Sequence, residues 1–203
     1  MNLKAIFNPK SIAVIGATPN TAKIGHVVLR DLVKSFPGRI YPVNPKYGEI
    51  LGLKCYPKIS NIPSRIDLAV IIVPAKIVPK IMKECGEKGV KGAIIISGGF
   101  KEVGNFELEE KVRKIADKYG IPVIGPNCLG VVDNYTGVDT IFNPRYKMHR
   151  PRQGSISFIT QSGAVGAVVM DWAGYKGFGV SKFISYLSLI HISEPTRLGM
   201  ISY

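Results

Sequence analysis

The fold is decided by the stretch Ile12-Ala-Val-Ile-Gly-Ala-Thr-Pro-Asn-Thr-Ala-Lys-Ile-Gly25. A short apolar run stops at Gly16, a polar loop follows, and a helical pattern begins near Ile24. A strand, a glycine turn and a helix in this order point backbone N–H groups and a helix start at one place, which suits a phosphate. Gly16 and Gly25 are its only glycines, so the stretch matches the G-x-G-x-x-G pattern of nicotinamide-binding proteins poorly. It predicts a phosphate-bearing cofactor without identifying it.

Apolar runs of this kind recur along the chain, with helical patterns between them. The runs are rich in Val and Ile and almost free of polar residues, as strands buried on both faces of a parallel sheet are. They predict strands over residues 11–15, 40–43, 68–73, 93–96 and 123–124. Apolar residues at helical spacing predict helices over residues 25–34, 78–88 and 107–119. The alternation predicts an α/β fold, a Rossmann-like doubly wound domain over residues 1–145.

The alternation of strand and helix patterns stops over residues 133–153. These residues show no clear period and are interpreted as a connection between domains. The alternation resumes with a predicted strand over 155–160, a helix over 164–175 and a strand over 180–186. Residues 146–186 are therefore expected to begin a second α/β domain. Two strands and one helix are too few to enclose a core, so we expect this domain to be incomplete. Apolar side chains expected to lack partners are Val168, Val169, Trp172, Phe183 and Ile184.

Composition excludes several classes of partner. The net charge is +13, but Lys and Arg are spread along the chain and do not alternate with aromatic residues, so no nucleic-acid partner is expected. No apolar stretch approaches the roughly 20 residues that span a bilayer, so no membrane association is expected. The first residues lack the apolar core of a secretory signal, and the expected location is cytoplasmic.

Three cysteines, with no C-x-x-C spacing, argue against a disulfide framework and against a zinc site. Cys55 and Cys85 are expected to be buried, inert thiols. Cys128 could be considered a nucleophile, but its neighbour Asn127 is not a base, so a packing role is expected. No metal site is predicted.

Each predicted strand ends in a polar or glycine-containing turn. In an open α/β sheet, ligands bind beyond the carboxyl ends of the strands. One such turn would only reverse the chain, but five at one edge predict a ligand site. They cover residues 16–18, 44–46, 74–75, 97–99 and 125–128.

The tip of the second strand is basic. The nicotinamide fold places a carboxylate there to bind the ribose hydroxyl, whereas this chain has Asn44, Pro45 and Lys46. A cation suits a phosphorylated ribose, which both coenzyme A and NADP carry. The loop and this tip leave those two cofactors open.

A set of motifs in order along the chain resembles one family. The motifs are Ile12-Ala-Val-Ile-Gly-Ala, Ile40-Tyr-Pro-Val-Asn-Pro-Lys46, Gly48-Glu-Ile-Leu-Gly52, Asp67-Leu-Ala-Val, Val73-Pro-Ala, Ile95-Ile-Ser-Gly-Gly-Phe-Lys-Glu102, Ile124-Gly-Pro-Asn-Cys-Leu-Gly130 and Ile156-Ser-Phe-Ile-Thr-Gln-Ser-Gly-Ala-Val-Gly166. Over residues 1–186 the chain resembles the NDP-forming acyl-CoA synthetases, in particular the α part of the ADP-forming acetate–CoA ligases. Succinyl-CoA synthetase α subunits are more distantly similar. The resemblance implies a first domain that binds coenzyme A and a second, flavodoxin-like domain.

The resemblance also implies roles for individual residues. The cofactor's phosphates would be cradled by Gly16, Ala17, Thr18, Lys23 and Gly25. Its nucleotide end would be bordered by Asn44, Pro45 and Lys46. The path to the thiol would be lined by Val73, Pro74, Ser97 and Gly98, and the reaction centre by Pro126 and Asn127.

The turn Gln161, Ser162 and Gly163 places a hydroxyl and N–H groups at a helix start, which can bind an anion. From the residues alone, Ser162 is better explained as an ordinary N-cap. The resemblance implies that this turn faces a phosphorylated histidine.

In such enzymes, as the resemblance implies, an acyl phosphate forms, a histidine takes the phosphoryl group, ADP receives it, and the acyl group leaves on coenzyme A. ATP or ADP and Mg²⁺ would bind to an ATP-grasp β subunit or fused domain, and the complete enzyme would be an oligomer. None of His26, His149 and His191 matches the phosphorylated histidine, which lies later in the family's second domain. We therefore expect this chain to be inactive alone.

Two other functions share parts of this pattern. A non-catalytic module that senses coenzyme A or a nucleotide would share the same first domain. An NADP-dependent reductase is disfavoured by the glycine spacing of the first loop.

The last residues form a separate segment. Leu187-Ser-Leu-Ile-His-Ile-Ser-Glu-Pro-Thr-Arg197 resembles the translation of a sequencing-library adaptor, so residues 187–203 are expected to be read-through. The alternative is a divergent tail, but nothing in it continues the α/β rhythm.

Overall fold

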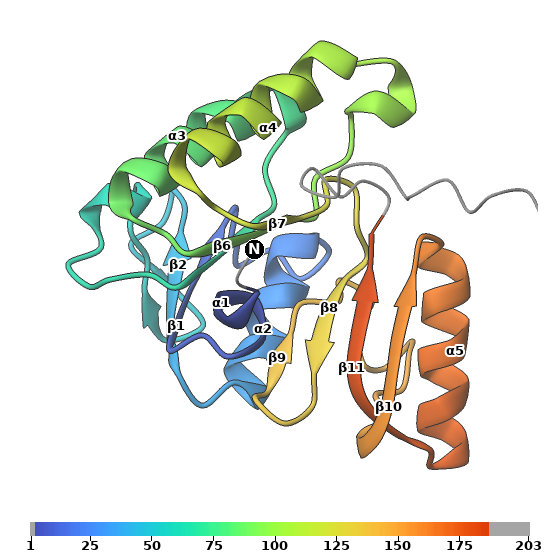
Figure 1. Ribbon diagram of the computed structural model, residues 1–203. Coiled ribbons are helices and arrows are strands. Elements are labelled where there is room, and N and C mark those ends of the chain that lie inside the picture. Colours follow the sequence, from blue (N-terminus) through green and yellow to red (C-terminus); the bar gives the residue numbers. More distant parts are fainter. Residues whose placement is uncertain (1–2, 187–203) are drawn as a thin grey trace, which may run out of the picture.

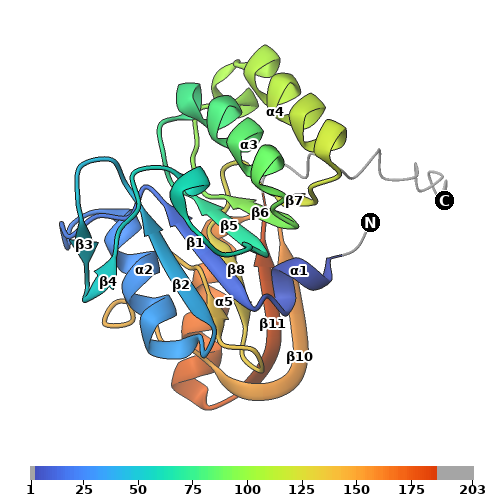
Figure 2. The same ribbon diagram turned by 90° about the vertical axis from the view of Figure 1, so that its left-hand side faces the viewer.

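The computed structural model describes residues 3–186 and contains a five-stranded parallel sheet at its centre. The strand order is β2-β1-β5-β6-β7, which Figure 2 shows from one side. The strands are β1 (Ser11–Ile15), β2 (Arg39–Val43), β5 (Leu68–Ile71), β6 (Gly92–Ile95) and β7 (Val123–Ile124). A small antiparallel pair, β3 (Glu49–Ile50) and β4 (Leu53–Lys54), follows β2. The predicted doubly wound α/β fold is confirmed.

Strand β1 is buried over its whole length because both faces of the sheet are covered. Side chains alternate along a strand, so Ile12 and Val14 enter one apolar cluster while Ala13 and Ile15 enter the other. Helices α3 (Val78–Lys88) and α4 (Phe106–Tyr119) cover the second of these faces. Helix α2 (Ile24–Ser35) lies on the opposite face (Figure 1).

Helices α3 and α4 each end at a glycine. Gly89 and Gly120 have φ angles of 76° and 62°, a left-handed conformation that glycine adopts without a Cβ clash.

The short elements were not predicted from the sequence. They are α1 (Lys4–Phe7), η1 (Ile59–Asn61), η2 (Ala75–Ile77) and η3 (Lys101–Val103).

A second sheet has the order β10-β11-β8-β9. It combines β8 (Gly130–Asp133) and β9 (Val138–Asp139) with β10 (Arg152–Thr160) and β11 (Gly179–Ser185), and α5 (Gly163–Lys176) packs beside it (Figure 1). The segment predicted to be irregular therefore contains β9, and β8 runs antiparallel to β11. The second sheet draws strands from both sides of residue 145, so the division between residues 1–145 and 146–186 stays a prediction.

One expectation about the second unit is wrong. Phe183 was expected to lack partners, but it is fully buried and stacks on Phe158 with ring centroids 6.0 Å apart. Ile184 is also half-buried against the apolar cluster beneath the first sheet. The reason is that β8 pairs with β11 and brings Leu129 and Val132 onto Phe183, a contact between segments that lie about 50 residues apart.

The outer side of the second unit is apolar and exposed. Val168 and Trp172 on α5 are 68% and 54% exposed, and Ile159 on β10 is 61% exposed. The exposure of Val168 agrees with the expectation that it lacks partners. Trp172 does have a partner, because it stacks on Phe178 with ring centroids 5.2 Å apart, and Val169 is half-buried. The expectations for residues 187–203, including His191, lie outside the described residues. No helix in residues 3–186 is long and apolar enough to cross a membrane.

Two substitutions on α5 test this burial pattern. Val168→Lys should change the free energy of unfolding by no more than about 0.5 kcal/mol, because the side chain is already exposed. It should also reduce aggregation, because it interrupts an exposed apolar patch. Met170→Lys should cost more than about 3 kcal/mol, because Met170 is fully buried and a lysine there would have no partner.

Urea unfolding and light scattering of both variants provide the measurement. Equal stability of the two variants would show that α5 does not pack in the manner described.

Candidate functional site

The turns that follow the five parallel strands lie together at one edge of the sheet. Parallel strands that are paired in register end at the same edge, and the pairing of β1 with β2 and β5 runs through Ile15 on β1. The structure therefore brings the predicted turn residues of the first domain to one edge, in the order of their strands.

The two glycines of the first turn are explained by close packing. Gly16 has a φ of 98°, and a Cβ on it would lie 2.0 Å from the carbonyl oxygen of Ile72. A Cβ on Gly25 would lie 2.1 Å from the carbonyl oxygen of Gly16. The absence of both side chains lets the start of α2 rest directly on the turn. Backbone N–H groups at that helix start thus come to the edge of the sheet.

Asn44 ties the second turn to the first. Its Nδ2 donates to the carbonyl oxygen of Ala17 at 2.8 Å, and its Oδ1 accepts from the backbone N–H of Lys46 at 2.9 Å. On the other side of the loop, buried His26 places Nδ1 3.2 Å from the carbonyl oxygen of Thr18. His26 therefore supports the loop from within the fold.

Ser97 connects the remaining three turns. Its Oγ accepts from the backbone N–H of Val73 at 3.1 Å, and its carbonyl oxygen accepts from the N–H of Asn127 at 2.9 Å. The turns after β5, β6 and β7 are thereby held in fixed relation. Pro74 begins the segment next to Val73, and Pro126 immediately precedes Asn127.

Glu102 is a site-shaping residue that the sequence analysis missed. Its carboxylate accepts from the N–H groups of Gly99 and Phe100, and a Cβ on Gly98 would lie 3.2 Å from its Oε1. Partial burial opposes ionisation of Glu102, but these backbone N–H groups outweigh it and lower the pKa below its ordinary value. An acidic residue three positions after a Gly-Gly pair was the available signal.

The cysteines are buried, as expected. Burial raises the pKa of the Cys128 thiol to about 12, and its Sγ lies 3.4 Å from the carbonyl oxygen of Ile95. Because thiolate is the nucleophilic form, Cys128 stays protonated near neutral pH. This supports the packing role expected for it.

The start of α5 faces the last turn of the first sheet. Ser162 is the N-cap: its Oγ accepts from the N–H of Val165 at 3.2 Å, as the N-cap interpretation expects. A cavity of about 390 Å³ lies between this helix start and the turn after β7, with Asn127, Gln161 and Gly163 in its lining. The structure thus places Asn127, expected at the reaction centre, in the same cavity as Gln161 and Gly163 of the expected phosphate site.

Two lysines at the other end of the row remain available. Lys23 and Lys46 are exposed, and neither forms an ion pair with another residue of the described chain. Asn44 lies in the same turn as Lys46, and its side-chain hydrogen bonds go to the backbone of Ala17 and Lys46 rather than to a carboxylate. This end of the edge therefore offers positive charge to a ligand.

His149, the other histidine in residues 3–186, is also hydrogen-bonded. The backbone N–H and Nδ1 of His149 both lie within 2.8 Å of Asp171 Oδ1, on the exposed side of α5. Residues 3–186 contain no group of three or more His, Cys, Asp or Glu side chains arranged to hold a metal ion.

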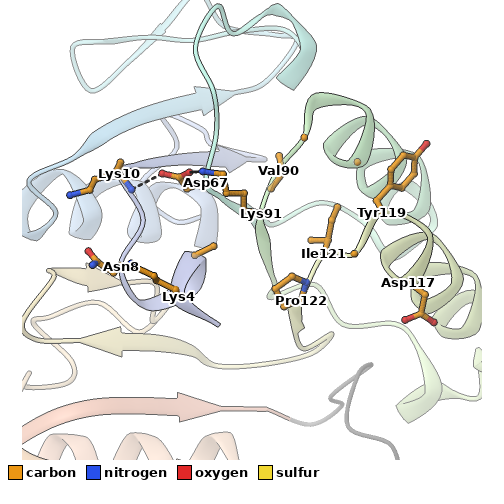
Figure 3. Close-up of a pocket in the computed structure, with 14 residues that line it drawn as sticks. Lys4, Asn8, Lys10, Asp67, Val90, Lys91, Asp117, Tyr119, Ile121 and Pro122 are labelled. Carbon is orange, nitrogen blue, oxygen red and sulfur yellow. Dashed lines mark hydrogen bonds and ion pairs between the residues drawn. The ribbon is translucent and has the colours of Figure 1, made fainter. Parts of the chain in front are cut away.

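A larger cavity, about 990 Å³, lies at the opposite edge of the sheet, where the strands begin (Figure 3). Its wall includes Asp67, whose carboxylate pairs with Lys91 Nζ at 2.7 Å and accepts from the backbone N–H of Lys10 at 2.8 Å (Figure 3). These contacts join the starts of three strands, β1, β5 and β6. None of the predicted site residues lines this cavity.

Comparison with known proteins finds two family matches. Residues 10–134 match the model of a CoA binding domain, and residues 153–196 match that of a succinyl-CoA ligase like flavodoxin domain. The second match continues beyond Tyr186 into the segment that was expected to be read-through.

Among curated relatives, the ADP-forming acetate–CoA ligase of Methanocaldococcus jannaschii is 47% identical over 97% of this chain and 27% of its own length. The α subunit of the ADP-forming acetate–CoA ligase I of Pyrococcus furiosus is 42% identical, over 98% of this chain and 44% of its own length. The chain thus spans less than half of each of these two relatives.

A solved structure, the apo form of the dinucleotide forming acetyl-coenzyme A synthetase 1 of Ca. Korarchaeum cryptofilum, is similar with a TM-score of 0.87. It is 40% identical and covers 95% of this chain and 42% of its own. The arrangement of both sheets is therefore shared with that enzyme.

Paired glycine substitutions test the geometry of the first turn. Gly25→Ala should lower the free energy of unfolding by about 1–3 kcal/mol, because its Cβ would collide with backbone that cannot easily move. Gly48→Ala is the matched control and should be nearly neutral, because nothing lies within 4 Å of its Cβ position. Urea denaturation measures both; a neutral Gly25→Ala would refute the close packing of α2 on Gly16.

Proposed function

The chain belongs to the CoA binding domain family, and from this premise we propose that it is the coenzyme A-binding part of an ADP-forming acyl-CoA ligase. The observation that carries the proposal is the row of linked turns at the carboxyl edge of the first sheet. Asn44 links the turns after β2 and β1, and Ser97 links those after β5, β6 and β7. Such an edge is where open α/β sheets bind their ligands.

The residues fit an elongated cofactor with a charged end and a reactive end. Neighbouring strands are about 4.8 Å apart, so the row extends for roughly 19 Å across the five strands of the sheet. Lys46 and Lys23 would neutralise phosphates at one end. Val73, Pro74, Ser97 and Gly98 would lie along an uncharged arm, and Pro126 and Asn127 would border its far end.

Coenzyme A would supply the thiol that accepts the acyl group. The chain's own residues hold and orient the cofactor: Gly16, Ala17, Thr18 and Gly25 form the turn against which its phosphates would rest. Ser162 is the N-cap of α5, and the other helix-start residues, Gln161 and Gly163, would face an anion across the cavity from Asn127.

Phosphoryl transfer would require groups other than the histidines described here. His26 is buried under the first turn, and His149 is held by Asp171, so neither is placed to accept a phosphoryl group at the cavity. We propose that ATP or ADP, with Mg²⁺, binds to an ATP-grasp domain or β subunit and that the assembled enzyme is oligomeric. The match to an α subunit supports this division of labour.

Calorimetric titration of the chain tests the proposed cofactor. Coenzyme A should bind more tightly than dephospho-coenzyme A, because Lys46 would pair with the phosphate on the ribose. It should also bind more tightly than NADPH, because the glycine spacing of the first turn matches that of nicotinamide-binding loops poorly. Lys46→Ala should weaken coenzyme A binding about tenfold and dephospho-coenzyme A binding much less.

Lys83→Ala is the control for loss of one positive charge, because Lys83 is exposed on α3 and is not one of the predicted site residues. It should leave all three affinities within about twofold. Preference for NADPH, or equal loss of affinity in the two lysine variants, would overturn the proposal.

A further inference from the structure

The cavity between the turn after β7 and α5 has a mixed lining. Its polar side chains are Asn127, Asn143, Gln161 and Ser185, and its apolar side chains include Leu129, Phe142 and Ala167. None of the side chains that line it is charged. A group that fits this cavity is therefore uncharged and can contact both amide and apolar side chains.

The cavity lies at the end of the row of turns. The strand order places the turn with Lys46 at one end of the edge and the turn with Asn127 at the other. If coenzyme A lies with its phosphorylated ribose at Lys46, its thiol reaches Asn127 and whatever the thiol carries enters the cavity. We infer that this cavity binds the acyl group and that Phe142 and Ala167 determine which acyl groups fit. This inference rests on the proposed function.

Ala167 limits the cavity from the side of the helix. Gly163, Ala164 and Ala167 follow one another at helical spacing on the same side of α5 and all line the cavity. Their small side chains leave space where a longer side chain would fill it. Ala167 is half-buried against the core of the second unit, so a larger side chain there would project into the cavity.

Phe142 limits the cavity from the opposite side. It follows β9, its backbone N–H donates to the carbonyl oxygen of Leu129 at 3.4 Å, and its ring packs against the apolar clusters of both sheets. The ring is therefore held in place and acts as a fixed wall. A smaller side chain at this position would lengthen the cavity.

The charges near this wall are already paired. Arg150 donates to Asp139 Oδ2 and to the carbonyl oxygen of Asn143, both at 2.9 Å. A second carboxylate on an acyl group would enter without a cation to meet it, which is unfavourable in a partly enclosed site. The cavity thus favours uncharged acyl groups of small size over dicarboxylic ones.

Titration of the 203-residue chain with coenzyme A, acetyl-, isobutyryl-, benzoyl- and succinyl-coenzyme A tests the inference. Ala167→Leu should weaken isobutyryl-coenzyme A about tenfold and leave coenzyme A within about twofold. Phe142→Leu should act in the opposite direction and strengthen benzoyl-coenzyme A relative to acetyl-coenzyme A. Val168→Leu, at the adjacent exposed position of α5, is the control and should change none of the ratios.

The outcomes separate the two proposals. If the chain binds none of the coenzyme A compounds, the proposed function fails. If it binds coenzyme A but neither variant changes the acyl ratios, or if succinyl-coenzyme A binds as tightly as isobutyryl-coenzyme A, the inference about the cavity is wrong and the proposed function stands. Far-ultraviolet circular dichroism checks that each variant is folded, and either variant alone suffices for the comparison.

Discussion

The site depends on hydrogen bonds that join one turn to the next. Parallel strands bring their carboxyl ends to one edge, but the turns themselves would be free to move apart. Ser97 prevents this for three of them, because its hydroxyl bonds Val73 and its carbonyl bonds Asn127. Asn44 does the same for the other two through the carbonyl of Ala17. These contacts hold the five loops as two linked groups along the edge where we propose that the ligand binds.

A second constraint places α5 opposite that edge. Arg150, in the segment before β10, pairs with Asp139 on β9 and lies 3.7 Å from Asp31 on α2, and all three side chains are buried. Breaking a buried ion pair from one side is costly, so this cluster fixes the second sheet against the first domain. Gln161 and Gly163, on either side of the Ser162 cap, line the 390 Å³ cavity together with Asn127.

Sequence patterns predicted the first sheet well because its signals are local. The run from Ser11 to Ile15 is uniformly apolar after its first residue, and Gly16 marks its end. β8 and β9 could not be predicted in this way, because they are short and depend on pairing. β8 pairs with β11, roughly 50 residues later, and β9 pairs with β8. The wrong expectation for Phe183 follows from the same omission.

The candidate site was predicted as a set of turns but not as a network. Nothing in the sequence shows that Asn44 reaches Ala17, or that Glu102 folds back on Gly99, since both contacts depend on how the loops meet in space. The glycines were interpreted as room for a ligand, and the structure adds that Gly16 and Gly25 make room for each other. Phe142 and Ala167 carry no motif and are found only through the cavity that they line.

The most direct test of this account is a crystal structure of the chain with bound coenzyme A. The account predicts that the phosphorylated ribose lies beside Lys46, that the arm passes Val73 and Ser97, and that the thiol lies beside Asn127. A cofactor bound in the reverse direction, or in the cavity beside Asp67 at the opposite edge of the sheet, would contradict it.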